Sequence, residues 1–307
     1  MFDKVIVGFD GSDHALDALL LGQALTACGG EMIVCCVHHF QSLSARVDPT
    51  EPRIDRESAE KSVKEAARLL DRGLSVTWTV LAGASTATSL QRTAVAEQGD
   101  LIVLGSSHRG ALGRVLVGSV TEETLHQAPC PVAIAPAGFR SQPGGAQLTR
   151  IAVGVDGGDP VPSGLAVAQA LCEQTGAELR VVAVADNRVS SPESAIFEYT
   201  NILDARRHAG EQAVAGALST LPDTVSALSE VRDGRPVEQL LEVTSDVDLL
   251  VLTSHGRGFV GRLAMGSVCD LLVRAAACPV LVVPPSKSTD APASTRISPT
   301  ISSAHGS

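Results

Sequence analysis

The sequence predicts two tandem α/β domains, each a doubly wound five-stranded parallel sheet of the Rossmann-like kind. Short runs of Val, Ile and Leu alternate with segments whose apolar residues recur at helical spacing, a pattern typical of a parallel sheet with helices on both faces. Aromatic residues make up only 3% of the chain, which favours aliphatic packing over an aromatic-filled sandwich. The whole pattern occurs twice within 307 residues, a length that suits two domains.

The first half is expected to contain five strands. The strand-like runs are KVIVGF at 4–9, MIVCCV at 32–37, SVTWTVL at 75–81, LIVLG at 101–105 and CPVAIAP at 130–136. Helices are expected after Gly11-Ser12, at about 57–70, after Gly83 and after Ser119, where apolar residues recur every three or four positions. Each strand but the last is therefore followed by a helix.

The second half repeats this order. IAVGVDGG at 151–158 matches VIVGFDGS at 5–12, and DLLVLTSHGRG at 248–258 matches DLIVLGSSHRG at 100–110, at an offset of 148 residues for the second pair. A repeat this long indicates a duplicated domain, because solenoid units have periods of about 20 to 50 residues. We predict domains at 1–137 and 149–285, a Gly- and Pro-rich linker at 138–148, and a disordered polar tail at 286–307.

Charge and cysteine content narrow the functional class. The formal net charge of −10 argues against a nucleic-acid surface. The seven cysteines form no C-x-x-C pair, which favours free thiols in a reducing compartment, and at least one of Cys35 and Cys36 is expected to be a small buried hydrophobe. We see no secretory signal and no apolar run of the ~18 residues that a membrane span needs. We therefore expect a soluble, cytoplasmic protein that contacts neither membrane nor nucleic acid.

Two glycine-rich stretches resemble anion-binding loops. GSSHRGALGRVLVGS at 105–119 and TSHGRGFVGRLAMGS at 253–267 each follow an apolar run and precede a helical pattern. Glycine allows backbone N–H groups to approach a ligand closely, and a helix beginning there presents unpaired donors to a phosphate. The alternative is a capping box, since Ser119 with Glu122 and Ser267 with Asp270 have the required spacing. On one copy alone, the two interpretations are equally good.

With these motifs in the same order in both halves, the chain resembles the universal stress protein family. Each half has V-G-x-D-G after its first strand, a Gly-Ser step before a helix, and a closing C-P-V strand. The ATP-binding branch of that family carries G-x2-G-x9-G-[S/T] in this loop, on a sheet like that of the adenine-nucleotide α-hydrolases. The resemblance covers all but the linker and tail and implies a tandem member that binds ATP and Mg²⁺.

The resemblance also implies roles for individual residues. Asp10 and Asp156 would lie near the ribose, the phosphates and any metal, so both are candidate Mg²⁺ ligands. Val37 and Val184 would line the adenine. The remaining expected nucleotide contacts are Gly11, Gly105, His108, Gly118 and Ser119 in the first half, and Gly157, Thr253, Gly256, Gly266 and Ser267 in the second.

Both loops depart from the motif. His108 occupies the second glycine position of the first loop, where a Cβ would block phosphate if the backbone needs a positive φ, although an imidazolium would favour phosphate. Thr253 occupies the first glycine position of the second loop and is expected to crowd the ribose. We expect nucleotide binding in both halves, with the nucleoside side better preserved in the first and the phosphate side in the second.

The leading functional hypothesis is an ATP-binding regulator in a stress or dormancy response, acting on a protein partner. A slow ATP hydrolase or adenylyl-transferring enzyme is one alternative, but the chain has no P-loop and no nucleophile elbow. A nucleotide-free interaction scaffold is the other.

The last strand of each half is an apolar edge that needs covering. VAIA at 132–135 and VLVV at 280–283 carry no charged residue, and exposed apolar edges invite pairing. We expect these two strands to pair with each other within the chain. A further homodimer is left open.

Overall fold

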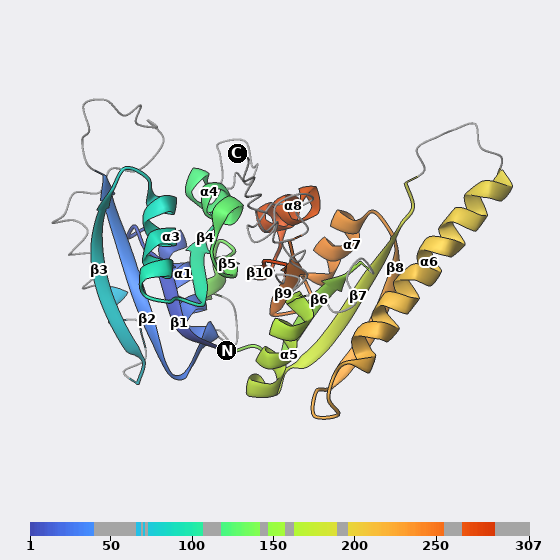
Figure 1. The fold of residues 1–307 in the computed structure, drawn as a ribbon, viewed down its shortest axis with the longest axis horizontal. Coiled ribbons are helices and arrows are strands. Elements are labelled where there is room, and N and C mark those ends of the chain that lie inside the picture. Colours follow the sequence, from blue (N-terminus) through green and yellow to red (C-terminus); the bar gives the residue numbers. More distant parts are fainter. Residues whose placement is uncertain are drawn as a thin grey trace, which may run out of the picture.

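The computed structural model describes residues 1–39, 66–68, 70, 73–106, 118–141, 147–156, 163–188, 196–254 and 266–285. Its ten strands form one sheet in the order β3-β2-β1-β4-β5-β10-β9-β6-β7-β8, and Figure 1 shows β3 near one end of the molecule and β8 near the other. The order within the second half, read from its outer edge, repeats that of the first. All strand pairs within a half are parallel, so the predicted fold class is confirmed.

The first half contains the elements expected from its sequence. They are β1 (Phe2–Gly8), α1 (Asp13–Leu25), β2 (Thr26–His39), β3 (Ser75–Gly83), α3 (Thr86–Ala96), β4 (Leu101–Gly105), α4 (Ser119–Gln127), β5 (Val132–Ala135) and the 3₁₀ turn η1 (Phe139–Ser141). The helix predicted at about 57–70 lies mostly outside the described residues. β2 begins six residues earlier than the apolar run MIVCCV, directly where α1 ends.

The second half has the same order. Its elements are β6 (Arg150–Val155), α5 (Ser163–Thr175), β7 (Glu178–Asp186), α6 (Ile196–Ser219), β8 (Ala227–Gly234), α7 (Pro236–Val243), β9 (Leu249–Thr253), α8 (Ser267–Ala275) and β10 (Val280–Val283). None of the helices in the described part of the chain is both long and apolar enough to cross a membrane.

Two apolar cores lie on opposite faces of the sheet. One contains side chains of α1, α5 and α6, such as Leu19, Leu171 and Val214. The other contains side chains of α3, α4, α7 and α8, such as Leu90 and Leu272. Since alternate strand residues point to opposite faces, the continuous Val-, Ile- and Leu-rich strands supply both cores.

The two halves join through their last strands. β5 and β10 pair antiparallel, with Val280 opposite Ile134, Leu281 opposite Ala133 and Val282 opposite Val132. All of these side chains are buried. The expectation that VAIA and VLVV cover each other within the chain is confirmed, and the joint turns two five-stranded sheets into one.

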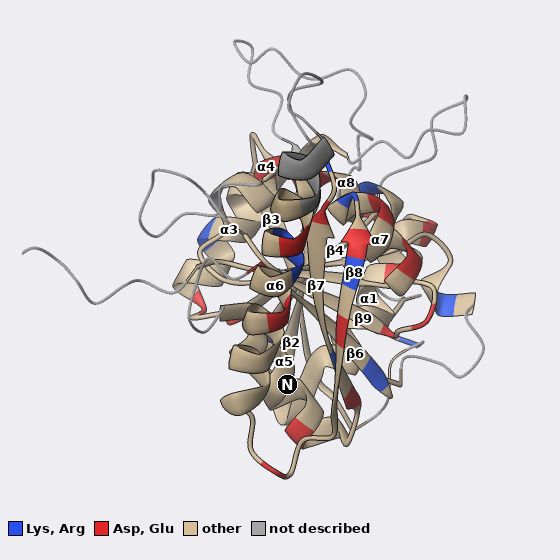
Figure 2. Ribbon diagram, turned by 90° about the vertical axis from the view of Figure 1, so that its right-hand side faces the viewer, with Lys and Arg blue, Asp and Glu red and all other residues tan. Residues whose placement is uncertain are grey.

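The outer edge of the second half is protected by charge. Arg232 of β8 pairs with Glu230 at 2.6 Å and with Glu242 of α7 at 2.9 Å, and Arg207 of α6 pairs with Asp233. Figure 2 looks onto this side, where basic and acidic segments lie on β8 and the neighbouring helices. Charged side chains on an edge strand discourage further strand pairing.

Candidate functional site

The topology places one switch point in each half. From β1 the chain passes to β2 on one side, while β4 flanks β1 on the other; β6, β7 and β9 repeat this arrangement. Ligands of open α/β sheets collect beyond the carboxyl ends of the strands at such a point. Most of the residues expected to contact nucleotide follow β1, β4, β6 and β9.

Asp10 and Gly11 form a tight turn between β1 and α1. The Asp10 carboxylate accepts a hydrogen bond from the Ser12 N–H at 2.9 Å, and Gly11 has a φ of +81°, in the left-handed region that favours glycine. Ser12 then caps α1 by accepting a hydrogen bond from the Ala15 N–H at 3.2 Å. The exposed Asp10 is therefore held at the carboxyl end of β1 by local turn geometry, and Asp156 is exposed at the corresponding end of β6.

The helices α4 and α8 begin at glycine. Gly118 and Gly266 are the N-cap residues, with φ/ψ of −63°/151° and −74°/157°. Their carbonyls accept the first helical hydrogen bonds, from the Glu122 N–H at 3.0 Å and the Asp270 N–H at 3.1 Å. The capping-box alternative is wrong, because Ser119 and Ser267 are the first residues within the helices and the cap position carries no side chain.

Glycine is not required at these caps by backbone conformation. Both φ values lie in the ordinary extended range that every residue type adopts. Glycine at both positions allows another group to approach the first N–H donors of the helix closely.

The first turns of α4 and α8 are anchored to the ends of the neighbouring strands. The Thr121 hydroxyl donates to the Gly105 carbonyl at 3.4 Å, and in the second half the Cys269 thiol lies 3.9 Å from the Thr253 carbonyl oxygen. The helix N-termini therefore lie directly at the switch points.

Gly105 and Thr253 occupy equivalent positions, but the glycine that permits close strand–helix packing lies on the strand in the first half and on the helix in the second. A Cβ at Gly105 would lie 2.2 Å from the carbonyl oxygen of His14 in α1, so only glycine fits. In the second half the glycine is on the helix: a Cβ at Gly164 of α5 would lie 2.8 Å from the Thr253 hydroxyl, and the Gly164 N–H donates to that hydroxyl at 2.9 Å. The buried Thr253 hydroxyl thus faces α5, and the expectation that Thr253 crowds a ribose stays a prediction.

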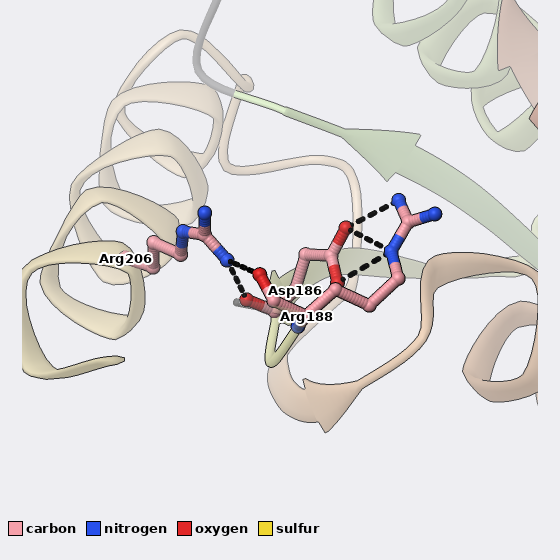
Figure 3. Close-up of polar contacts among 3 residues, drawn as sticks. All are labelled: Asp186, Arg188 and Arg206. Atoms are coloured by element: carbon pink, nitrogen blue, oxygen red, sulfur yellow. Dashed lines mark hydrogen bonds and ion pairs between the residues drawn. The ribbon is translucent and has the colours of Figure 1, made fainter. Parts of the chain in front are cut away.

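Val37 and Val184 lie near the carboxyl ends of β2 and β7, as their expected position beside the base requires. Beyond Val184 the second half carries a charged cluster, drawn in Figure 3. The Arg188 Nε donates to the Asp186 carboxylate at 2.8 Å, and the Arg206 Nη1 donates to the carbonyl of Arg188 at 2.8 Å. The hydrogen bonds from Arg188 hold the pKa of Asp186 below its usual range. The corresponding strand end in the first half carries His38 and His39, so the two halves differ in the residues at this strand end.

Several predicted contacts lie outside the described residues. These are His108, Gly157 and Gly256. Within the described part of the chain, no group of three or more His, Cys, Asp or Glu side chains could hold a metal ion.

Three residues at the switch points were not predicted from the sequence: Ser106, Ser254 and Gly164. Ser106 and Ser254 are buried hydroxyls at the ends of β4 and β9. They are serine in both copies at the same offset as the motif glycines, a signal that could have identified them. Gly164 could not have been identified, because its role depends on a contact between a strand and a helix 89 positions apart.

A model of the universal stress protein family matches residues 1–136 and 147–284. The chain belongs to this family. Universal stress protein Rv2005c of Mycobacterium tuberculosis is 31% identical over 291 residues, which cover 91% of this chain and 96% of that protein. Universal stress protein Rv2319c of the same organism is 27% identical, covering 78% of this chain and 84% of the relative.

Solved structures support the fold. A universal stress protein from Archaeoglobus fulgidus matches with a TM-score of 0.59 at 19% identity, covering 92% of this chain and 98% of its own. A protein from Pseudomonas aeruginosa described as functionally unknown matches with a TM-score of 0.63 at 17% identity, covering 92% and 93%. Both likenesses extend across the two halves. Because the family model matches once in each half, the chain is a tandem member of the family.

Proposed function

We propose that this tandem universal stress protein binds ATP at the two switch points and acts as a nucleotide-dependent regulator in a stress or dormancy response. The observation that carries the proposal is the pair of glycine-capped helices, α4 and α8, anchored at the ends of β4 and β9. Each presents its first N–H groups and the positive end of its dipole to the crevice, the arrangement that binds phosphate.

Mg²⁺ is proposed to accompany the nucleotide. Asp10 and Asp156 are exposed carboxylates at the two crevices, and one carboxylate per site is in keeping with Mg²⁺, which takes many of its ligands from phosphates and water. The ion would neutralise phosphate charge when bound. Asp10 and Asp156 would hold it, each in its own half.

The regulatory part of the proposal involves α4 and α8. Arg274 of α8 lies 3.7 Å from Glu122 of α4 and 2.8 Å from Asp270 of its own helix. The two helices that would contact phosphate are thus linked across the joint between the halves. Nucleotide binding at either site would favour one conformation of the surface that α4 and α8 form together, which is a population shift. We expect slower amide hydrogen exchange in both helices when ATP is added.

The test is a search for bound nucleotide. Acid denaturation of the purified protein should release an adenine nucleotide, and ATP with Mg²⁺ should raise the melting temperature of the nucleotide-free protein, because a ligand that binds the folded state stabilises it. Absence of both effects would contradict the proposal and favour the scaffold.

The same preparation separates regulator from enzyme. Phosphate release above background that disappears in the double variant Asp10→Ala/Asp156→Ala would favour slow hydrolysis. A regulator should bind ATP without releasing phosphate above background.

A further inference from the structure

A single guanidinium joins the first turns of α4 and α8. Arg274 of α8 donates to the Asp270 carboxylate from Nε at 3.0 Å and from Nη2 at 2.8 Å, and the same Nη2 lies 3.7 Å from Glu122 Oε2 in α4. Glu122 and Asp270 are equivalent residues of the two halves, and each lies in the first turn of its helix. Arg274 therefore contacts the same position of both copies, once within its own half and once across the joint.

The two carboxylates belong to the residues that close the first helical turns. The Glu122 N–H donates to the Gly118 carbonyl at 3.0 Å, and the Asp270 N–H donates to the Gly266 carbonyl at 3.1 Å. Gly118 and Gly266 are the N-caps at which the phosphates are proposed to bind. A ligand that orders one of these N-caps therefore also orders a residue that Arg274 holds.

The contacts of Arg274 are partly shielded from solvent. Its side chain is 24% exposed, compared with 31% for Asp270 and 49% for Glu122. The hydrogen bond to Asp270 and the charges of Asp270 and Glu122 raise the pKa of Arg274 above its ordinary value. Because salt screens partly buried pairs less than exposed ones, the bridge should persist at physiological ionic strength.

The bridge runs in one direction only. The residue of α4 that corresponds to Arg274 is His126, which is exposed. Among the residues that the structure describes, Arg274 and Glu122 form the one ion pair between α4 and α8. Direct ion pairing between the two helices therefore depends on Arg274.

We infer that Arg274 couples the two nucleotide sites, so that a nucleotide bound at one of the two helices strengthens binding at the other. This inference rests on the proposed function and adds a regulation to it. A phosphate that orders the first turn of one helix would, through Arg274, also order the first turn of the other. The second nucleotide then loses less conformational freedom when it binds. The coupling acts equally in both directions, as any coupling between binding sites must.

Calorimetric titration with ATP and Mg²⁺ measures the coupling. The single-site variants Gly118→Glu and Gly266→Glu give the affinity of each site when the other is blocked. In the native chain the second ATP should bind about 2- to 5-fold more tightly than these affinities predict, the range expected for a partly exposed ion pair. In Arg274→Gln, compared with single-site variants that carry the same substitution, the two ATP molecules should bind independently.

Amide hydrogen exchange shows where the coupling is transmitted. In Gly266→Glu, ATP has access only to the first site, yet it should slow exchange in α8 as well as in α4. When Arg274→Gln is added to this variant, ATP should still protect α4 and should no longer protect α8.

Two further variants separate coupling from a structural role of Arg274. Glu122→Gln removes the bridge but keeps the pair of Arg274 with Asp270 within α8, so it should abolish the coupling as Arg274→Gln does. Arg235→Gln is the control, because it removes an ion pair of 2.8 Å with Glu238 at α7, away from the joint, and it should leave the coupling unchanged.

The outcomes distinguish this inference from the proposed function. If the native chain binds no ATP, or if Gly266→Glu still binds two ATP molecules, the proposed sites fail and the inference fails with them. If the native chain binds two ATP molecules independently, only the inference is overturned. Coupling that persists in Arg274→Gln or in Glu122→Gln would also overturn it, as would an equal loss of coupling in Arg235→Gln.

Discussion

At the scale of single residues, Gly105 and Thr253 show how two copies of one fold can diverge without changing shape. The strand end must approach the helix that follows the first strand. In the first half the strand residue is glycine and the backbone of His14 fills the space, whereas in the second half the helix residue is glycine and Thr253 fills it. Thr253 departs from the glycine motif, and Gly164 compensates by leaving room for its side chain. The Thr253 side chain points to the face of the strand opposite to that of Ser254.

Thr253→Val should destabilise the protein by about 1–3 kcal/mol. Valine has the shape of threonine but leaves the buried Gly164 N–H without its acceptor. Thr253→Ser keeps the acceptor and should cost less than about 1.5 kcal/mol for the lost methyl group. Urea denaturation of both variants measures the difference. Equal stability of the valine and serine variants would show that the hydrogen bond is not important.

Cysteine reactivity should be confined to one position. Of the seven cysteines only Cys28 is exposed, and all are free thiols. Burial raises the pKa of Cys35, Cys130 and Cys278 to about 12, and that of Cys36, Cys172 and Cys269 to about 11. A thiolate is the reactive form, so the buried thiols should be inert at neutral pH.

A chromogenic thiol reagent at pH 7 should therefore titrate one cysteine rapidly in the native protein and all seven after denaturation. Cys28→Ser should abolish the rapid phase. Two or more rapid thiols in the native chain would contradict the structure.

At the scale of elements, α1 holds the segment that leaves the first half. Asp17 is only 2% exposed, and its carboxylate accepts the N–H groups of Gly138 at 2.8 Å and Arg140 at 2.9 Å. Arg140 also donates to Asp13 at 2.7 Å. The chain following β5 is thus tied to the helix that begins beside Asp10.

Asp17→Asn should destabilise the protein by about 2–3 kcal/mol, because the amide has one acceptor oxygen and places an NH₂ group against a backbone donor. Asp13→Asn is the control: Asp13 is 77% exposed and pairs with Arg140 at the surface, so its loss should cost less than about 1 kcal/mol. Thermal and urea denaturation measure both. A smaller loss of stability for Asp17→Asn than for Asp13→Asn would show that Asp17 does not anchor this segment.

Asp248 ties the start of β6 to the start of β9 and should make stability pH-dependent. Burial acts to raise its pKa, but hydrogen bonds from the Thr149 hydroxyl and from the N–H groups of Thr149 and Arg150 outweigh it, so the pKa lies below the ordinary value of 3.8. A carboxylate with a lowered folded-state pKa stabilises the protein above its unfolded pKa, and this stabilisation is lost as the pH falls through the folded value.

Asp248→Asn should therefore be less stable than the native chain at pH 7, by about 1 kcal/mol because the carboxylate is partly hydrated. The difference should shrink below about pH 4. Urea denaturation at pH 7 and pH 3.5 tests this. A stability difference between the two proteins that grows on acidification would contradict a lowered pKa for Asp248.

Most of the element order could be predicted from sequence, because Val-rich runs and helical periodicity are local signals. The joint between the halves followed from the uncharged edges VAIA and VLVV. The choice between a capping box and an anion-binding loop stayed open, since the spacing of a capping box does not reveal whether the N-cap is Ser119 or Gly118. The Thr253–Gly164 contact and the orphaned hydroxyls of Ser106 and Ser254 depend on tertiary packing, which local patterns do not encode.

At the scale of the whole molecule, the antiparallel joint of β5 and β10 makes one sheet of ten strands with two switch points. The glycine-capped helices of both halves lie on the same face of this sheet and are linked by Arg274 and Glu122. This arrangement places two equivalent helix N-termini over one continuous sheet. It is the physical basis for proposing a nucleotide-dependent regulator.

The most direct test of this account is calorimetric titration of ATP with Mg²⁺ into the native chain and into Gly118→Glu/Gly266→Glu. Both glycines have an ordinary φ, so glutamate fits the backbone but places bulk and negative charge where phosphate would bind. Gly216→Glu is the control, because Gly216 is exposed in α6 with nothing within 4 Å of an added Cβ. The native and control proteins should bind ATP, and the double variant should not. Equal ATP binding by all three would contradict this expectation.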